Sequence, residues 1–207
     1  MLNMEKIDLK KELKAFYNPP AKDVTLIDVT KMNFIMIDGQ GAPESPQFAQ
    51  SIEALYPIAY TIKFDKKKAD GIDYGVMALE GLFWADDMKV FMPGTADRNQ
   101  WQWTLMIMQP DFVTRKDFDN AVSAAKKKKD NPSIDKVRFQ SFTEGKAAQI
   151  MHIGPYSEEG SNIQKLHHKI AEIGAKLSGR HHEIYLSDPR RAAPDKMKTV
   201  VRQPYSL

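Results

Sequence analysis

The residues best suited to chemistry in this 207-residue chain lie in the segment HHEIYLSDP, which begins at His181. Because side chains alternate along a strand, we expect Glu183 and Tyr185 to share one face and Ile184 and Leu186 to pack against helices on the other. A carboxylate beside a tyrosine in an apolar cleft suits a general base or an anchor for a cation. The alternative interpretation is an ordinary glutamate on a solvated strand face.

A second carboxylate echoes the first. Aligning MALEGLFW with HHEIYLSD places Glu80 opposite Glu183 and Leu82 opposite Tyr185. If both carboxylates reach one cleft, one orients water while the other tunes its proton affinity, because close like charges raise a carboxylate pKa. The alternative is that Glu80 is peripheral or structural, as charged strand residues commonly are.

Aromatic residues accompany these carboxylates. Trp84, Trp101 and Trp103 gather around one predicted strand pair, and Trp101 and Trp103 share a face at a spacing of two. Such a cluster suits a stacking surface for a flat ligand, although burial in the core is the commoner fate of a tryptophan. Tyr156 follows the turn Gly154-Pro155 and is a candidate to close over the same groove.

The five histidines do not predict a metal centre. His167 and His168 are adjacent on a predicted helix, and His181 and His182 point to opposite faces of a predicted strand. The chain has no HExxH sequence and no cysteine. We therefore expect no metal site.

The elements that position these residues are written twice. The strand-like run FIMIDG, a helix and the runs YGVMALEG and WTLMIMQP are followed later by IMHIG, a helix, HHEIYLSDP and KTVVRQP. This order predicts an α+β fold made by tandem duplication of a strand-helix-strand-strand module. We expect a mostly antiparallel sheet with helices on one side and a concave ligand groove on the other. Residues 1–22 form an N-terminal extension, and residues 23–207 a single domain of two pseudo-repeats, about 23–110 and 111–207.

Local patterns predict the individual elements. Apolar runs predict hairpins that pair 24–29 with 33–38 and 137–142 with 147–153. A helix starts at Ser45-Pro46 and is kinked or ended early by Pro57, with 63–73 as a loop. Further predictions are strands 74–84 and 100–109 around a lid-like hairpin 85–99, helices from Thr114 to about 130 and from 163 to a stop at Gly174, and strands 181–187 and 199–203.

Composition narrows the functional class. Thirty basic and 27 acidic residues leave a formal charge of +3, too small for the electrostatic footprint of a nucleic-acid-binding protein. The absence of cysteine is compatible with a reducing compartment. The first 17 residues mix both charge signs and lack a long apolar core, so we expect neither a signal peptide nor a membrane anchor, and a cytoplasmic location.

The segments IMHIGPYSEE and HHEIYLSDPRR, together with the doubled module, resemble the GyrI-like small-molecule-binding family over nearly the whole chain. The resemblance implies two modules around a concave groove, with a glutamate equivalent to Glu183 facing the groove and aromatic residues beside it. Because only about twenty residues precede the first strand, the transcription-factor role of some members does not carry over.

Members of that family also include proteins that hydrolyse the cyclopropane ring of DNA-alkylating natural products. The resemblance therefore implies a cofactor-independent detoxifying hydrolase for planar lipophilic compounds, in which Glu183 activates water and Tyr185 donates to the developing oxyanion. The alternative is a non-catalytic module that sequesters lipophilic cations or docks on a protein such as gyrase. A weaker alternative is tetrapyrrole binding through His152.

Overall fold

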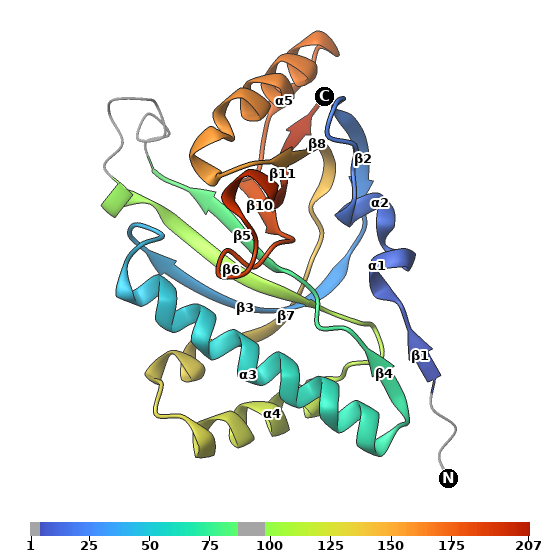
Figure 1. Ribbon diagram of the computed structural model, residues 1–207, viewed down its shortest axis with the longest axis vertical. Helices are drawn as coiled ribbons and strands as arrows, with labels where there is room; N and C mark the ends of the chain where they lie inside the picture. The colour runs from blue at the N-terminus through green and yellow to red at the C-terminus, as the bar shows by residue number, and fades with distance from the viewer. Residues whose placement is uncertain (1–4, 87–97) are drawn as a thin grey trace. The chain divides into compact units, whose positions relative to one another are not determined.

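The computed structural model describes residues 5–86 and 98–207, which form a mixed α/β fold with a mostly antiparallel sheet (Figure 1). The predicted α+β class is confirmed. Most of the predicted 85–99 hairpin lies outside the described residues. The first half contains β1 (Glu5–Ile7), α1 (Leu9–Glu12), α2 (Lys14–Tyr17), β2 (Thr25–Val29), β3 (Met32–Gln40), α3 (Pro46–Ala69), β4 (Ile72–Tyr74), β5 (Leu79–Trp84) and β6 (Gln102–Gln109). The second half contains α4 (Arg115–Lys128), β7 (Arg138–Phe142), β8 (Gly145–Ile153), α5 (Gly160–Glu172), β9 (Lys176–Leu177), β10 (His181–Tyr185) and β11 (Lys198–Ser206).

The chain divides into two compact units, each built from segments that are distant in the sequence. Unit 1 comprises Met1–Leu9, Met32–Met77 and Phe83–Phe142. Unit 2 comprises Lys10–Lys31, Ala78–Leu82 and Thr143–Leu207. Each unit therefore takes strands from both sequence repeats: β2 of the first repeat lies in unit 2, and β7 of the second lies in unit 1.

In unit 1, α3 packs on β3 and β6 with α4 beside it (Figure 1). Ser45 caps α3, since its hydroxyl accepts a hydrogen bond from the backbone nitrogen of Phe48 at 3.3 Å. Thr114 and Asp117 form a capping box at the start of α4, as the sequence pattern predicts. The apolar face of α3 meets the apolar residues of β3 and β6, which are almost wholly buried, and α4 packs against α3.

The course of α3 differs from the prediction. Pro57 does not end the helix, which continues as far as Ala69, so the predicted loop 63–73 is wrong over most of its length. The lysine and aspartate residues of this segment can adopt a helical conformation, and some of their side chains form ion pairs. Lys66 forms ion pairs with Asp70, one turn later, and with Asp117 of α4, at 3.0 and 2.9 Å. These ion pairs and the packing on the sheet offset the hydrogen bond that proline removes.

In unit 2 the strands lie in the order β2, β8, β11, β10, with the first part of β5 next to β10. Helix α5 covers one face of β8 and β11. Its apolar stripe buries Leu166 and Ile170 against Ala148, Ile150 and Val201. Gly174 follows with φ 72°, a left-handed conformation that ends the helix where the sequence predicts.

Both predicted hairpins are wrong. β2 pairs with β8, with Val29 opposite Gly145, and β3 pairs with β7, with Met32 opposite Phe142. The two pairings are equivalent. Phe142 lies 113 residues after Val29, and Gly145 lies 113 residues after Met32, so the same two positions of the repeat are paired in both cases. The predicted turn is Thr30-Lys31-Met32. The common two- and three-residue hairpin turns need a residue with positive φ, and among the described residues only glycines have one, so this segment does not form such a turn. The first strand of each repeat instead pairs with the second strand of the other repeat: β2 with β8, and β7 with β3.

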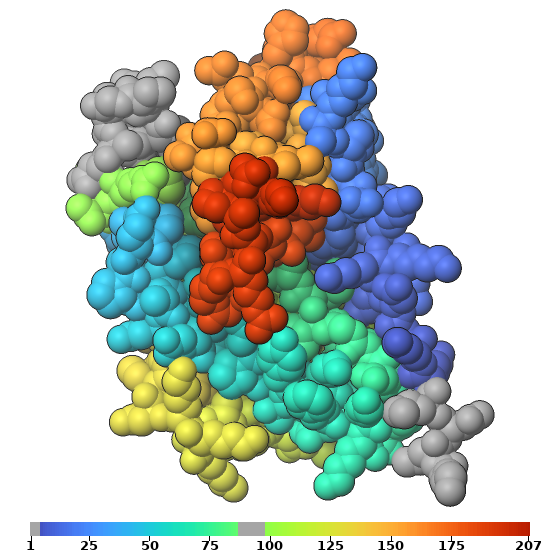
Figure 2. All heavy atoms as spheres, in the orientation of Figure 1, coloured from blue at the N-terminus to red at the C-terminus, as the bar shows by residue number. Residues whose placement is uncertain are grey.

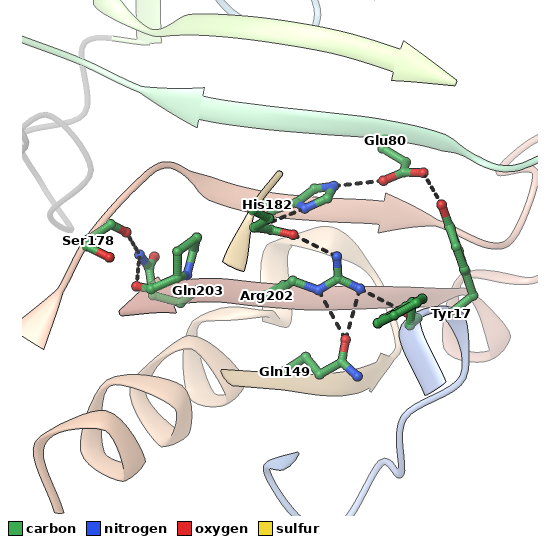
Figure 3. A network of polar contacts seen from close by, with 10 residues as sticks. Tyr17, Glu80, Gln149, Ser178, His182, Arg202 and Gln203 are labelled. Atoms are coloured by element: carbon green, nitrogen blue, oxygen red, sulfur yellow. Dashed lines mark hydrogen bonds and ion pairs between the residues drawn. The ribbon is translucent and has the colours of Figure 1, made fainter. Parts of the chain in front are cut away.

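A buried polar network holds the N-terminal segment against the sheet of unit 2 (Figure 3). At its centre, the Arg202 guanidinium on β11 donates to Gln149 Oε1, to the Phe16 carbonyl oxygen at 2.6 Å and to Glu144 Oε2 at 2.8 Å. Gln149 in turn donates to the Ala15 carbonyl oxygen at 2.7 Å. Residues 10–22 of the predicted extension therefore belong to unit 2, and the backbone carbonyl groups of Ala15 and Phe16 bind them to its sheet.

The network continues onto β10. His182 Nδ1 lies 2.9 Å from Glu144 Oε1, and His182 Nε2 lies 3.0 Å from Glu80 Oε2 (Figure 3). The Tyr17 hydroxyl donates to the other oxygen of Glu80 at 2.7 Å. Although burial opposes the charge, Glu144 and Glu80 raise the pKa of His182 to about 9. Likewise burial is outweighed at Glu144, where the charges of His182 and Arg202 lower the pKa to about 2. Two acidic and two basic side chains therefore share one buried site.

These shifts predict how the stability of the protein depends on pH. A histidine whose pKa is raised from 6.5 to about 9 stabilises the fold fully below about pH 6.5, and this contribution disappears as the pH rises through 9. The free energy of unfolding should fall by up to about 3 kcal/mol over that range through this group. The His182→Gln variant should lose stability at pH 6 and show a smaller slope between pH 6.5 and 9, measured by urea unfolding.

His168→Gln is the matched control, because His168 is exposed on α5. An identical slope in the wild type and in His182→Gln would show that His182 is not charged in the folded protein.

Candidate functional site

Glu183 lies in the middle of β10, and its side chain is 19% exposed. The Tyr185 hydroxyl donates a hydrogen bond to Glu183 Oε2 at 2.7 Å. On the other side, His181 Nε2 lies 3.3 Å from Glu183 Oε1. The predicted alternation therefore holds: positions 181, 183 and 185 share one face, and both carboxylate oxygens are engaged by side chains of the same strand.

The face that these residues occupy differs from the prediction. Glu183 is opposite Val201 in the β10–β11 register, and Val201 packs against α5. Residues directly opposite each other in an antiparallel pair point to the same side, so Glu183 and Tyr185 lie on the α5 side. Ile184 instead shares the other face with His182. The expectation that Ile184 and Leu186 face helix α5 is wrong. Ile184 lies on the face of β10 where His182 takes part in the buried ion network.

The residues that precede α5 complete the surroundings of Glu183. The ring of Tyr156 meets the ring of Tyr185 edge to face, with centroids 5.5 Å apart and an interplanar angle of 78°. Tyr156 is 38% exposed, so this aromatic pair borders the surface. Glu159 follows at the N-cap position of α5 and is buried. Tertiary structure therefore brings together three predicted site residues, Glu183, Tyr185 and Tyr156, with one that the sequence analysis did not select.

The two carboxyl groups hold opposite protonation states. Burial and the nearby charge of Glu183 raise the pKa of Glu159 to about 9. Burial also opposes ionisation of Glu183, but the neighbouring His181 ring and the hydrogen bond from Tyr185 lower its pKa. Burial and the charge of Glu183 hold the pKa of Tyr185 well above its usual value, so the phenol stays a donor. At neutral pH the site thus contains an ionised base, Glu183, beside a protonated acid, Glu159.

Glu80 does not join this group. It is buried in the network of Tyr17 and His182, and His182 points to the opposite face of β10 from Glu183. The hypothesis that Glu80 and Glu183 reach one cleft is therefore wrong, and the structural alternative for Glu80 holds. The alignment with Glu183 gave no signal of this difference, because it cannot show which face each carboxylate takes.

The three tryptophans lie in unit 1. Trp103 is fully buried, packs edge to face on Phe48 at 5.1 Å, and donates its indole N–H to the Gly41 carbonyl oxygen at 3.2 Å. Trp101 is partly exposed, and its ring meets the ring of Phe83 edge to face with centroids 6.2 Å apart. Trp84 is also partly exposed, at the end of β5. Trp103 is therefore a core residue, and Trp101 and Trp84 remain predictions as a stacking surface.

His152 is held by two hydrogen bonds. Its Nε2 donates to the Pro155 carbonyl oxygen at 3.0 Å, and its Nδ1 accepts from the Asn162 amide at 3.1 Å. Both ring nitrogens are thus used to fix the turn before α5, which leaves neither for a haem iron in this arrangement. His152 also lies opposite Thr199, which in turn lies opposite Tyr185, so it supports the row of residues that carries the site.

Sequence reasoning missed Glu144, Glu159 and Thr199. Thr199 is fully buried on β11 and neighbours Glu159. The pattern SEEG before an apolar stripe signals a helix start, and it could have directed attention to Glu159. Glu144 precedes Gly145, whose φ of 76° marks a sharp backbone turn.

The loop that follows β10, with Arg190 and Arg191, is exposed on the surface (Figure 2, red).

An open depression of about 400 Å³ lies elsewhere, in unit 1, at the C-terminal end of α3. Its lining residues are Asp65, Lys66, Lys68, Ala69, Asp70, Asp117 and Asn120. Three of its charged side chains, Lys66, Asp70 and Asp117, are joined in ion pairs. None of the residues around Glu183 contributes to it, so this depression is not the candidate site.

No helix among residues 5–86 and 98–207 is long and apolar enough to cross a membrane.

Comparison with solved structures gives relatives of the whole chain. An uncharacterised conserved protein from Listeria innocua is 41% identical with a TM-score of 0.88, over 97% of this chain and 100% of that one. A structure described as a hydrolase from Listeria innocua is 40% identical with a TM-score of 0.85, over 98% of this chain and all of that one. The EcmrR C-terminal domain, 14% identical with a TM-score of 0.55 over 89% of this chain and 97% of that one, shares the fold. No curated protein matches the chain significantly.

The family comparison agrees with the fold. The model of the GyrI-like small-molecule-binding domain matches residues 22–205, which is nearly the whole chain and includes every residue around Glu183. This chain belongs to the GyrI-like small-molecule-binding domain family.

Proposed function

We propose that this protein is a cofactor-independent hydrolase that opens the cyclopropane ring of planar, lipophilic alkylating compounds, with Glu183 as the general base. The observation that carries the proposal is the position of the Glu183 carboxylate, which lies between His181 and Tyr185 and is mostly shielded from water. These neighbours lower the pKa of Glu183, which favours its ionised form. Two structures from Listeria innocua, 39% and 40% identical to the chain, are described as hydrolases, which supports an enzymatic role.

The reaction adds one water molecule. Glu183 takes a proton from water as the water oxygen forms a bond to the ring CH₂ carbon. The strained carbon–carbon bond breaks, and its electron pair moves through the conjugated system onto the substrate carbonyl oxygen, which is then protonated. General-base assistance of this kind contributes a factor of about 10² to 10⁴. The edge-to-face pair of Tyr156 and Tyr185 offers aromatic surface beside the carboxylate for a flat ligand.

The role of Tyr185 follows from its hydrogen bond. The resemblance implies that its hydroxyl donates to the substrate, but in this structure it donates to Glu183 Oε2 at 2.7 Å. It therefore orients the base and favours its ionised form. Because the pKa of Tyr185 is held well above its usual value, the phenol does not compete with Glu183 as a base at neutral pH.

A second candidate function uses the same residues without turnover. An ionised carboxylate beside two tyrosine rings also suits a lipophilic cation, which would gain an ion pair and contact with the ring faces. In this case the protein sequesters ligands. The two functions differ in the product: only the hydrolase yields a compound that has gained one water.

The first test replaces the base. In Glu183→Gln, kcat for ring opening of a cyclopropane-containing alkylator should fall by about 10² to 10⁴, because the amide cannot accept the proton. Binding of a neutral, ring-opened analogue should change less than about threefold, since size and shape are preserved. Mass spectrometry of the product and fluorescence titration measure the two effects.

Glu172→Gln is the control for this test, as Glu172 is an exposed glutamate at the end of α5. Full activity of Glu183→Gln would overturn the assignment of the base. If the wild type gives no hydrated product but binds lipophilic cations, and Glu183→Gln loses them, the sequestering function stands instead.

The second test removes the hydroxyl that donates to the base. In Tyr185→Phe the carboxylate loses a hydrogen bond that favours ionisation, so the pKa of Glu183 should rise. Because activity disappears as Glu183 is protonated, the acidic limb of the kcat/KM profile should move to higher pH, whereas kcat/KM at neutral pH should change little, since the carboxylate stays ionised there. Tyr60→Phe, on the exposed face of α3, is the control. An unmoved acidic limb would mean that Tyr185 does not act through Glu183.

A further inference from the structure

The side of α3 that faces away from the sheet of unit 1 carries a row of aromatic rings. Tyr60 and Phe64 are 47% and 56% exposed, and Tyr56, one turn before Tyr60, is partly exposed. The ring centroids are 6.3 Å apart from Tyr56 to Tyr60 and 6.2 Å apart from Tyr60 to Phe64, so the rings form a continuous ridge along the helix. Phenylalanine is among the residues most often buried, and an exposed ridge of this kind marks a contact surface.

This aromatic row lies on the side of α3 opposite its buried side. Tyr60 is two residues away from both Ile58 and Ile62, which are fully buried. Two residues correspond to slightly more than half a helical turn, so Tyr60 points away from the sheet. In Figure 1, α3 crosses the front of the sheet of unit 1, and its atoms form part of the surface in Figure 2 (cyan to turquoise). The row is therefore accessible to another molecule.

Charged residues of opposite sign stand at the two ends of the aromatic row. Glu53 lies three residues before Tyr56, and Lys67 lies three residues after Phe64. Glu53 and Lys67 are each seven residues from Tyr60, which is about two helical turns, so both charges lie on the same side of α3 as the rings. The side chain of Glu53 is 56% exposed and that of Lys67 is 39% exposed. An acidic end, an apolar centre and a basic end thus follow one another along the helix.

This arrangement is complementary to itself. When two copies of α3 cross in antiparallel directions at Tyr60, residue 53 of one copy lies opposite residue 67 of the other, and residue 56 lies opposite residue 64. Tyr56 then meets Phe64 of the second copy, and Glu53 meets Lys67 of the second copy. A two-fold dimer requires this property, because the same patch of surface serves both subunits. A partner of a different kind would not require a pattern that is symmetric about Tyr60.

The charges determine the direction of the pairing. In a parallel arrangement Glu53 would face Glu53, and Lys67 would face Lys67, so like charges would repel. In the antiparallel arrangement the ion pairs of Glu53 with Lys129 and of Lys67 with Asp73, both 2.8 Å long, join into a row of alternating sign. A carboxylate accepts several hydrogen bonds and an ammonium group donates three, so these ion pairs within each copy persist when the copies meet.

We propose that this protein forms a homodimer in which the α3 helices of two copies pack antiparallel across a two-fold axis at Tyr60. Tyr56, Tyr60 and Phe64 form the apolar centre of the interface, and Glu53 and Lys67 form its charged rim. An aromatic centre with a polar rim is the usual composition of a protein interface, and rows of side chains four residues apart are the ridges by which helices pack. Helix α3 lies in unit 1, so this inference does not depend on the function proposed for Glu183.

Sedimentation velocity tests the assembly and the face that forms it. From about 1 to 100 µM, the wild type should convert to a species with twice the 23.6 kDa mass of the chain. Tyr60→Lys places two ammonium groups at the axis, which should raise the dissociation constant at least about 100-fold. Circular dichroism verifies that the variant is folded. A monomer at every concentration of the wild type would overturn the inference and assign the aromatic row to a different partner, and an unchanged dimer in Tyr60→Lys would overturn the assignment to α3.

Exchange of the two rim charges tests the antiparallel contact. Glu53→Lys and Lys67→Glu should each weaken the dimer at least about tenfold, because each places like charges opposite each other. The double variant restores opposite charges across the interface, so its dissociation constant should return to within about threefold of the wild type. Glu172→Lys, the same charge change at an exposed position on α5, is the control and should leave the dimer unchanged. A double variant no tighter than the single variants would overturn the proposed contact.

Cross-linking provides a second measurement of the direction. The chain has no cysteine, so each variant carries one introduced thiol. Oxidation of Tyr60→Cys should yield a disulfide-linked dimer, because position 60 lies on the two-fold axis. With a short bismaleimide linker, Glu53→Cys and Lys67→Cys should cross-link when mixed but not separately, and Glu172→Cys is the control. Cross-linking of Glu53→Cys with itself but not with Lys67→Cys would show parallel helices and overturn the proposal.

Discussion

The buried guanidinium of Arg202 is the constraint on which unit 2 depends. A buried cation is costly unless it is both paired and fully hydrogen-bonded, so the surrounding chain must deliver acceptors to it. It receives them from three directions: Gln149 on the adjacent strand, the Phe16 carbonyl oxygen of α2, and Glu144 at the start of β8. The position of the N-terminal segment, the turn at Gly145 and the register of β8 with β11 all serve this one group.

The same network fixes the strand that carries the candidate site. His182 is clamped between Glu144 and Glu80, and the next residue along the chain is Glu183. Because side chains alternate, one residue along the strand separates a closed set of ion pairs on one face from a partly exposed carboxylate on the other. The rigid face limits the freedom of the reactive face, which is the arrangement expected of a preorganised site.

Two glutamates of unit 2 illustrate how environment assigns a role to a residue type. Glu144 faces two buried cations, which lower its pKa to about 2, and it stays ionised. Glu159 faces the Glu183 carboxylate, its pKa is raised to about 9, and it stays protonated. Both are buried, so the sign of the neighbouring charge, rather than burial alone, decides between a structural anion and a proton donor.

The sequence by itself determined the duplicated order of elements, the α+β class, most helix starts and the alternation that places Glu183 beside Tyr185. Each of these features follows from hydrophobic periodicity or helix capping, which depends only on residues that are close together in the sequence. Only the tertiary structure decided which strands pair, since β2 and β7 cross to the opposite repeat without any local signal. It also decided that Glu80 supports His182 rather than Glu183, and that Glu159, 24 positions earlier in the chain, lies near enough to Glu183 for the charge of Glu183 to raise its pKa. Such contacts depend on which faces meet in space, and a face has a partner only after the strands have assembled.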